Sequence, residues 1–253
     1  GAGTILRALT LSLNTVAAQL VDILPEGPLT SYNWLIDKLG FTILVPDDAS
    51  YAPMALGQLT YGATVREMTA AYCAFVNDGV YTAPRTYTLV TDSKGATVLD
   101  NTPKTNVAFS PNTAYTMTYM MQNAVQNGTG SEAVLPTIPV AGKTGTSTDY
   151  QDRWFMGCTP YYVAGVWMGY DTPERVSAVG NNPAAVMWQK VMRQVHSGLQ
   201  YKAFPYPYLG GDTQIFGYYD PYTGVLRQNS SDVYYDYNSW DNSYNYGYAS
   251  GYS

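Results

Sequence analysis

The sequence predicts a mixed fold of helices and strands, α/β in the broad sense and α+β more strictly, in which an antiparallel sheet packs against helices. Two patterns indicate it. Apolar residues recur at helical spacing in several segments. Three consecutive segments between residues 140 and 170 have the pattern of strands joined by short polar turns, which is typical of antiparallel pairing. A length of 253 residues with 46% hydrophobic residues allows one sizeable core.

The first helices are expected near the amino terminus. Apolar residues from Ile5 to Leu24 recur at helical spacing, which predicts one helical segment there. A second helix is expected from Ser31 to Leu39, where Gly40 ends it.

Two longer helices have clear start signals. Thr64 and Glu67 have the spacing of a capping box, in which each side chain bonds the other's free backbone N–H. This helix is expected to end at Asn77-Asp78-Gly79. Another begins with Ser110 as its cap and Pro111 at its first position, and it runs to Asn127-Gly128.

Strands are indicated by short segments that are separated by polar turn residues. A hairpin is expected between Tyr87–Val90 and Ala96–Leu99, around a turn at residues 92–95. The three strands of the main sheet are expected at Val140–Ser147, Arg153–Thr159 and Tyr161–Tyr170. A last helix begins at Pro183, capped by Asn182, and ends at Gly198.

Composition divides the chain into three parts. Residues 1–199 carry the helices and strands described above. Residues 200–228 form a small extension that could contain a hairpin around residues 220–224. Thirteen of the 25 tyrosines lie in the last 53 residues, and residues 229–253 are rich in Tyr, Asn and Ser without Lys or Arg. We expect this tail to be disordered, as a plain linker or tail or as a wall- or sugar-binding segment.

The charge content, the two cysteines and the single histidine argue against several functions. Only 13% of residues are charged and the net charge is −6, which does not suit a nucleic-acid binder. No apolar stretch approaches the roughly 20 residues that span a bilayer, and the first residues do not resemble a signal peptide. Cys73 and Cys158 lack metal-ligand spacing, and the single histidine, His196, lies in the last turn of an expected helix. We therefore expect neither a metal nor a cofactor.

The strongest candidate site is Lys143-Thr144-Gly145-Thr146, at the start of the first main strand. A lysine on a strand edge presents a cation to an anionic group such as a carboxylate. Gly145 lets a ligand backbone approach the strand, and the two threonine hydroxyls add donors. A free backbone N–H nearby could contribute to an oxyanion hole. On these four residues alone, an ordinary solvated Lys-Thr-Gly turn is as good an interpretation or a better one.

A second candidate is Ser12-Leu13-Asn14. The Ser-x-Asn pattern is weak by itself because it recurs elsewhere in the chain. Ser12 differs from the other serines because it lies among apolar helical residues, where an uncapped polar pair needs a reason.

Together these residues resemble the penicillin-binding transpeptidase family, whose motifs are Ser-x-x-Lys, Ser-x-Asn and Lys-Thr-Gly. The resemblance covers about residues 5 to 197. It includes Arg7-Ala8-Leu9 and Ala17 beside the second motif, Leu56-Gly57, Gly62, Met68, Ala70-Ala71-Tyr72, Asn77 and Gly79-Val80-Tyr81 after it, and Asp152, Trp154-Phe155, Gly157, Thr159-Pro160 and residues 165–171 beyond the third. It implies a β-lactamase/transpeptidase-like fold, with about three of the family's five sheet strands present here.

The resemblance also implies roles in acyl transfer. Lys143, Thr144 and Thr146, with Gly145 between them, would bind the terminal carboxylate of a D-alanyl-D-alanine stem peptide or of a β-lactam, and the backbone N–H near Thr146 would complete the oxyanion hole. Ser12 would relay a proton between Lys143 and the leaving amine. Asn14 would hold the substrate amide. A serine would form the acyl-enzyme, and a neighbouring stem peptide would accept the acyl group.

The sequence departs from the family at the first motif, because none of its six lysines has a serine three residues before it. We expect the nucleophile to lie upstream, in the same protein, and this chain alone to be inactive. The resemblance implies a bifunctional glycosyltransferase/transpeptidase that acts on the extracytoplasmic face of the cell membrane through an upstream anchor. A natural pseudoenzyme is the other interpretation of the missing motif. Two alternative functions remain at this stage, a D,D-carboxypeptidase or serine β-lactamase, and a non-catalytic sensor of peptidoglycan or β-lactams.

Overall fold

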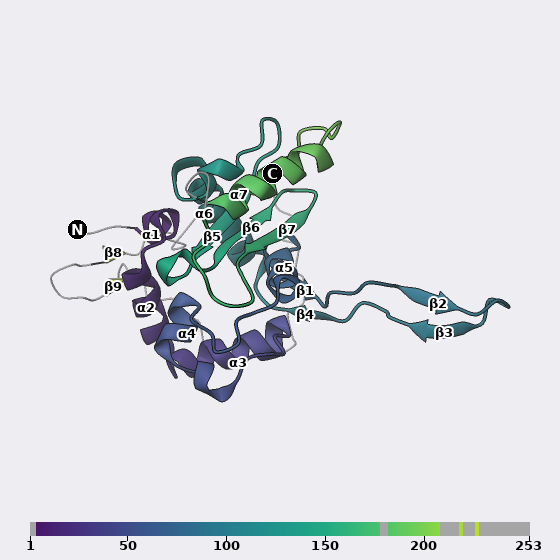
Figure 1. Cartoon of the computed structure of the whole chain (residues 1–253), viewed down its shortest axis with the longest axis horizontal. Helices are drawn as coiled ribbons and strands as arrows, with labels where there is room; N and C mark the ends of the chain where they lie inside the picture. Colours follow the sequence, from purple (N-terminus) through teal and green to yellow (C-terminus); the bar gives the residue numbers. More distant parts are fainter. Residues whose placement is uncertain (1–3, 178–181, 208–217, 220–225, 228–253) are drawn as a thin grey trace, which may run out of the picture.

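A computed structural model describes residues 4–177, 182–207, 218–219 and 226–227. Its centre is a sheet with helices on both faces (Figure 1). Helix α7 (Pro183–Val195) covers one face, where Trp188 packs edge-on against Phe155 with ring centroids 5.3 Å apart. Helices α5 (Val65–Cys73) and α6 (Pro111–Asn127) pack against the other side of the sheet, where Cys158 and Met121 share a core cluster. The layers confirm the mixed fold expected from the sequence.

The central sheet has three antiparallel strands in the order β5-β6-β7. They are β5 (Ala141–Thr146), β6 (Arg153–Cys158) and β7 (Val163–Met168). Phe155 of β6 lies opposite Thr144 on one side and Val166 on the other. The three strands expected between residues 140 and 170 are therefore confirmed. The first is one residue shorter at each end, the second one residue shorter at its carboxyl end, and the third two residues shorter at each end.

The amino-terminal segment differs from the sequence prediction. One helical segment was expected from Ile5 to Leu24, but the structure has two helices, α1 (Ile5–Leu11) and α2 (Asn14–Asp22). Ser12 lies between them in the left-handed conformation, with a φ of 55°, and its backbone N–H caps α1. Apolar periodicity did not reveal this break because it continues across both helices.

Helix α3 (Pro28–Leu39) begins three residues before the expected start, because Pro28 occupies its first turn, and it ends at the left-handed Gly40 as expected. The helix predicted from the capping box is α5, followed by a 3-10 turn. Thr64 Oγ1 accepts a hydrogen bond from the backbone N–H of Glu67 at 3.1 Å, and Glu67 reaches back to Thr64. The short helix α4 (Tyr51–Leu56) was not predicted, because so few residues show no clear periodicity.

Both later helices begin at the expected caps. Ser110 Oγ accepts from the backbone N–H of Thr113 at 3.1 Å at the start of α6. The Asn182 side chain accepts from the backbone N–H groups of Ala184 and Ala185 at the start of α7. These caps confirm the start signals in the sequence.

Small antiparallel ladders complete the fold. The predicted hairpin is present as β2 (Leu89–Thr91) and β3 (Thr97–Asp100), and it projects from the body as an arm (Figure 1). At its base, β1 (Val80–Thr82) pairs with β4 (Thr105–Val107), which the sequence did not reveal. Strands β8 (Tyr218–Tyr219) and β9 (Leu226–Arg227) also pair. The tail that we expect to be disordered, residues 229–253, lies outside the described residues. In the part of the chain that is described, no helix combines the length and apolar character needed to span a bilayer.

Candidate active site

Ser12 is placed by the corner between α1 and α2. The left-handed backbone at this residue ends the short helix α1 and leaves the serine side chain exposed. Leu13 is extended and Asn14 opens α2, where its side chain is also exposed. The polar pair of the Ser-x-Asn motif therefore lies at an accessible corner.

Lys143 lies on β5, which is an edge strand of the three-stranded sheet that the described residues form. Its Nζ donates a hydrogen bond to Ser12 Oγ at 2.7 Å and another to the Thr144 carbonyl at 2.9 Å. Two of the sequence-predicted site residues, 131 positions apart, are thus in direct contact.

Partial burial changes the proton affinity of this lysine. Desolvation lowers the pKa of Lys143 from 10.5 to about 8, because removal from water disfavours the charged form. Near neutral pH the ammonium therefore gives up its proton more readily than a solvated lysine would. An amine of this pKa, bonded to a hydroxyl group, is suited to proton exchange.

The strand that carries Lys143 offers further groups at the same edge. Thr144 Oγ1 donates to Thr129 Oγ1 at 2.8 Å, so one of the two motif hydroxyls is held by a neighbouring loop. Thr146 is the last residue of β5 and is exposed. Gly145 lies opposite Trp154, and a Cβ there would lie 3.0 Å from the Trp154 Cβ. Packing against Trp154 is therefore a second reason for a glycine, besides access for a ligand backbone.

The residues that support this arrangement carry no sequence motif. Thr10 of α1 accepts a 2.6 Å hydrogen bond at its Oγ1 from Asn123 Nδ2 of α6. The Thr10 carbonyl accepts from the backbone N–H of Thr129 at 3.3 Å. A Cβ on Gly128 would lie 2.2 Å from that carbonyl oxygen, so only a glycine permits this approach. These contacts join segments far apart in the sequence, and no local pattern could have indicated them.

The loop that follows Thr146, the last residue of β5, is held by hydrogen bonds of Asp152. The backbone N–H of Asp152 donates to Ser147 Oγ at 2.7 Å, and Asp152 Oδ1 accepts from Trp167 Nε1 at 2.8 Å. Within the loop, Asp149 and Tyr150 both have a positive φ, of 57° and 61°. The carboxyl end of β5 is thereby fixed in place.

The single histidine and the two cysteines have structural surroundings: His196 and Cys158 are buried and Cys73 is half-buried. His196 is buried, with Nε2 2.8 Å from Thr159 Oγ1 and Nδ1 2.7 Å from the Met192 carbonyl oxygen. Cys73 and Cys158 are free thiols, and burial raises the pKa of both. Among the described residues, no cluster of His, Cys, Asp and Glu could hold a metal ion.

A layered sheet with a lysine–serine contact at its edge and threonine hydroxyls alongside is the arrangement of the penicillin-binding transpeptidase class. The sequence profile described as penicillin binding protein transpeptidase domain matches residues 4–192, and the chain belongs to this family.

Comparisons with individual proteins agree. Penicillin-binding protein 1A of Clostridium acetobutylicum is 40% identical over 209 residues, which is 82% of this chain and 25% of that protein. Penicillin-binding protein 4 of Bacillus subtilis is 37% identical over 197 residues, 78% of this chain and 31% of that protein. The chain thus spans between a quarter and a third of the length of these relatives.

Solved structures show the same fold. The D,D-transpeptidase domain of a peptidoglycan glycosyltransferase from Eggerthella lenta is similar with a TM-score of 0.61 at 25% identity, over 78% of this chain and 54% of that one. The penicillin-binding protein PonA1 of Mycobacterium tuberculosis has a TM-score of 0.66 at 22% identity, over 80% of this chain and 59% of that one. The β-lactamase/transpeptidase fold expected from the sequence is confirmed.

Proposed function

We propose that this chain carries part of the active site of a peptidoglycan D,D-transpeptidase, which cross-links stem peptides by acyl transfer. The observation that carries the proposal is the 2.7 Å hydrogen bond from Lys143 Nζ to Ser12 Oγ, which joins the second and third family motifs at one sheet edge. Membership of the family over residues 4–192 supports it.

In this proposal the edge of β5 binds the donor peptide. Lys143, Thr144 and Thr146 bind the terminal carboxylate of a D-alanyl-D-alanine stem or of a β-lactam, because an ammonium and two hydroxyls supply charge-assisted hydrogen bonds to an anion. The Thr144 hydroxyl donates to Thr129 Oγ1 in this structure, so in this proposal it rotates to donate to the carboxylate instead. Gly145 lets the peptide backbone lie along the strand, and the backbone N–H near Thr146 contributes to the oxyanion hole. Asn14 holds the substrate amide from the start of α2.

Ser12 and Lys143 move the proton. The hydroxyl of Ser12 both accepts and donates, so it can pass a proton from the Lys143 ammonium to the leaving amine of D-alanine. The lowered pKa of Lys143, about 8, reduces the cost of that transfer near neutral pH. Both residues touch the reacting groups in this scheme and are proposed as catalytic.

The nucleophilic serine is proposed to lie in a segment outside residues 1–253. No lysine of this sequence is preceded by a serine at the Ser-x-x-Lys spacing. The 25% of the clostridial relative that the chain spans is consistent with a longer protein. We propose the bifunctional type, with a glycosyltransferase domain and a membrane anchor upstream, acting on the extracytoplasmic face of the membrane.

Intact mass after incubation with a penicillin tests the proposal. The chain of 253 residues and a version extended upstream through the Ser-x-x-Lys motif would be compared, with Lys143→Ala of the extended protein as the control. We expect only the extended protein to gain one penicillin mass, and K143A to gain it far more slowly. Acylation of the present chain by itself would place the nucleophile within residues 1–253 and contradict the proposed site.

A further inference from the structure

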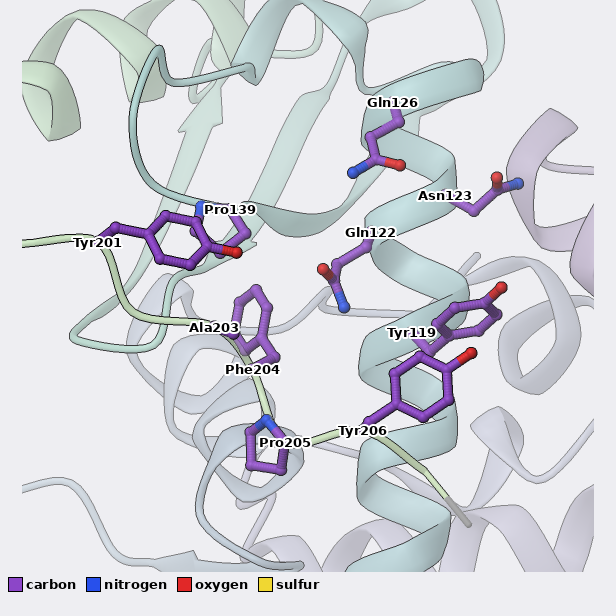
Figure 2. Close-up of a pocket in the computed structure, with 10 residues that line it drawn as sticks. All are labelled: Tyr119, Gln122, Asn123, Gln126, Pro139, Tyr201, Ala203, Phe204, Pro205 and Tyr206. Carbon is purple, nitrogen blue, oxygen red and sulfur yellow. The ribbon is translucent and has the colours of Figure 1, made fainter. Parts of the chain in front are cut away.

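A groove of about 250 Å³ lies outside the acyl-transfer site, between α6 and the segment that follows α7 (Figure 2). Gln122 and Gln126 point from α6 into the groove, towards the wall formed by Tyr201, Ala203 and Phe204. Tyr206 lies over the Tyr119 ring at the other end. Drug-sized ligands occupy pockets of about 300–1,000 Å³. This groove therefore suits a smaller unit, of the size of one ring.

The lining of the groove is uncharged throughout. Its walls consist of tyrosine and phenylalanine rings, prolines, an alanine and the side-chain amides of Gln122, Asn123 and Gln126. Lys202 lies within the segment, but its Nζ is bonded to the Pro160 carbonyl at 3.3 Å and does not line the groove. An ionic ligand would find no counter-charge in the lining, so the groove favours a neutral partner.

The segment that forms the outer wall is anchored from both sides. Tyr161 donates its hydroxyl to the Gln200 carbonyl at 2.8 Å, and Phe204 is buried in a core cluster with Met121. Tyr201 and Tyr206 flank this anchor and remain 72% and 68% exposed. The ring of Tyr206 meets that of Tyr119 edge-on, with centroids 5.6 Å apart. The backbone that carries both tyrosines is thus anchored, and the Tyr206 ring is also held by Tyr119, which lowers the ordering cost of binding.

The chemistry of this lining matches a sugar ring. Pyranose rings have one apolar face of C–H groups, which packs on aromatic rings, and a rim of hydroxyls that donate and accept hydrogen bonds. A side-chain amide supplies a donor and an acceptor close together, and two glutamines one helical turn apart present two such pairs. A charged peptide terminus could hydrogen-bond the amides, but it would lack a counter-charge in the lining and an apolar ring face to pack on the aromatic rings.

The groove shares its walls with the elements that hold the active site. Asn123 lines it and donates to Thr10, two residues before Ser12. Pro139 lines it two residues before the start of β5, the strand of Lys143. A polymer bound in this groove would therefore be held by the same framework that positions the reacting groups.

We propose that this groove binds one neutral sugar unit of a glycan strand, as an exosite for the polymer that carries the stem peptides. The assignment to the glycan of the transpeptidation substrate rests on the proposed function, whereas saccharide binding itself does not. The occupant that the structure favours is a β-linked N-acetylated sugar, because its acetamide group is uncharged and matches the amide lining.

NMR titration of the ¹⁵N-labelled chain with chitotetraose, the neutral N-acetylglucosamine tetramer, tests the proposal. We expect saturable shifts that include the side-chain amides of Gln122 and Gln126. Tyr206→Ala and Tyr201→Ala each weaken binding roughly fivefold, because each removes one stacking face. Tyr206→Phe retains most of the affinity because it keeps the ring.

Tyr61→Ala is the matched control, because Tyr61 is 74% exposed, close to the 72% of Tyr201, and lies outside the groove. Its affinity should equal that of the unaltered chain. Absence of saturable shifts, or equal affinities for Y201A, Y206A and Y61A, would overturn the proposal, as would selective capture of a proline-rich peptide in place of the saccharide. Penicillin acylation is measured separately, so failure of saccharide binding and failure of the transpeptidase proposal give different results.

Discussion

The ammonium of Lys143 and the hydroxyl of Ser12 lie 2.7 Å apart, although 131 positions separate the two residues. Two backbone features bring them together. The left-handed conformation of Ser12 ends α1 and turns its side chain to the surface, and the edge position of β5 leaves Lys143 beside that corner. A φ of 55° is strained for a serine, so this conformation has an energetic cost that a glycine would avoid.

Replacement of Ser12 separates this strain from the proton relay. Ser12→Gly and Ser12→Ala both remove the hydroxyl, but only alanine keeps a Cβ at the left-handed position. We predict that S12G is more stable than S12A by about 1 kcal/mol in urea unfolding. In the upstream-extended protein, both should lower the penicillin acylation rate by about 10²–10⁴-fold, the range of a general acid–base contribution.

Both variants lack the hydroxyl, so a fall in acylation rate that is common to both comes from the loss of that group. The difference in stability between them measures the strain of a Cβ at the left-handed position. If S12G acylated as fast as the unaltered protein, Ser12 would have a structural role only. If the two variants were equally stable, the left-handed conformation at this position would not be retained in solution.

Titration of Lys143 gives a direct check on its environment. Burial lowers its pKa to about 8, from 10.5. After reductive ¹³C-methylation, we predict one lysine resonance that titrates near pH 8 and is absent from Lys143→Arg. The pKa is lower in the folded than in the unfolded chain, so this group adds stability as pH rises from about 8 towards 10.5 and loses it as pH falls through 8. A resonance lost in K143R that titrated near 10.5 would contradict the burial of this amine.

Much of the fold could be predicted because its signals are local. The capping box at Thr64, the Ser110-Pro111 start of α6 and the Asn182 cap each depend on residues within one turn. The break at Ser12 could not be predicted, since the apolar periodicity continues through both helices and a left-handed serine has no sequence signature. Strands β1 and β4 are three residues each, and they pair over a long separation in sequence, with Val80 opposite Val107 and Thr82 opposite Thr105, so neither has a clear pattern of its own.

Part of the candidate site could also be predicted, because two of its residues belong to short sequence motifs. Lys143 and Ser12 carry recognisable motifs, and the structure brings them into contact. Their supports have no motif, because the contacts of Thr129 with Thr144 and of Asn123 with Thr10 exist only in the folded chain. The groove beside α6 also depends on the segment around Phe204 crossing that helix.

Glu67 links the start of α5 to the loop after α3. Its Oε1 accepts from the backbone N–H and the hydroxyl of Thr42, at 2.9 and 2.7 Å, and its Oε2 accepts from the corresponding groups of Thr64. Glu67→Gln leaves donors facing an amide NH₂ group, and we predict a loss of about 1–3 kcal/mol in unfolding free energy at pH 7. The exposed Glu174→Gln is the control and should change stability little.

The same carboxylate predicts acid sensitivity. Burial would raise the pKa of Glu67, but the hydrogen bonds from Thr42 and Thr64 outweigh it and hold the pKa below 4.5. A lowered folded pKa stabilises the fold above the unfolded value, and that contribution is lost as pH falls through the folded pKa. Urea unfolding below pH 4.5 should therefore show a smaller pH dependence for E67Q than for the unaltered chain. Equal slopes would mean that Glu67 does not contribute to acid unfolding.

Gly128 makes a close backbone contact with Thr10, two residues before Ser12. A Cβ there would lie 2.2 Å from the Thr10 carbonyl oxygen, so Gly128→Ala must push α1 away from the end of α6. We predict a loss of about 1–3 kcal/mol in unfolding free energy, together with a shift of the methylated Lys143 resonance, because Thr10 lies two residues before Ser12. Gly95→Ala is the control, since its φ of 83° imposes a strain cost of about 1–2 kcal/mol in open space on the distant β2–β3 arm. G95A should lower stability without moving the Lys143 resonance, whereas an unmoved resonance in G128A would show that the contact between Gly128 and Thr10 does not position Ser12.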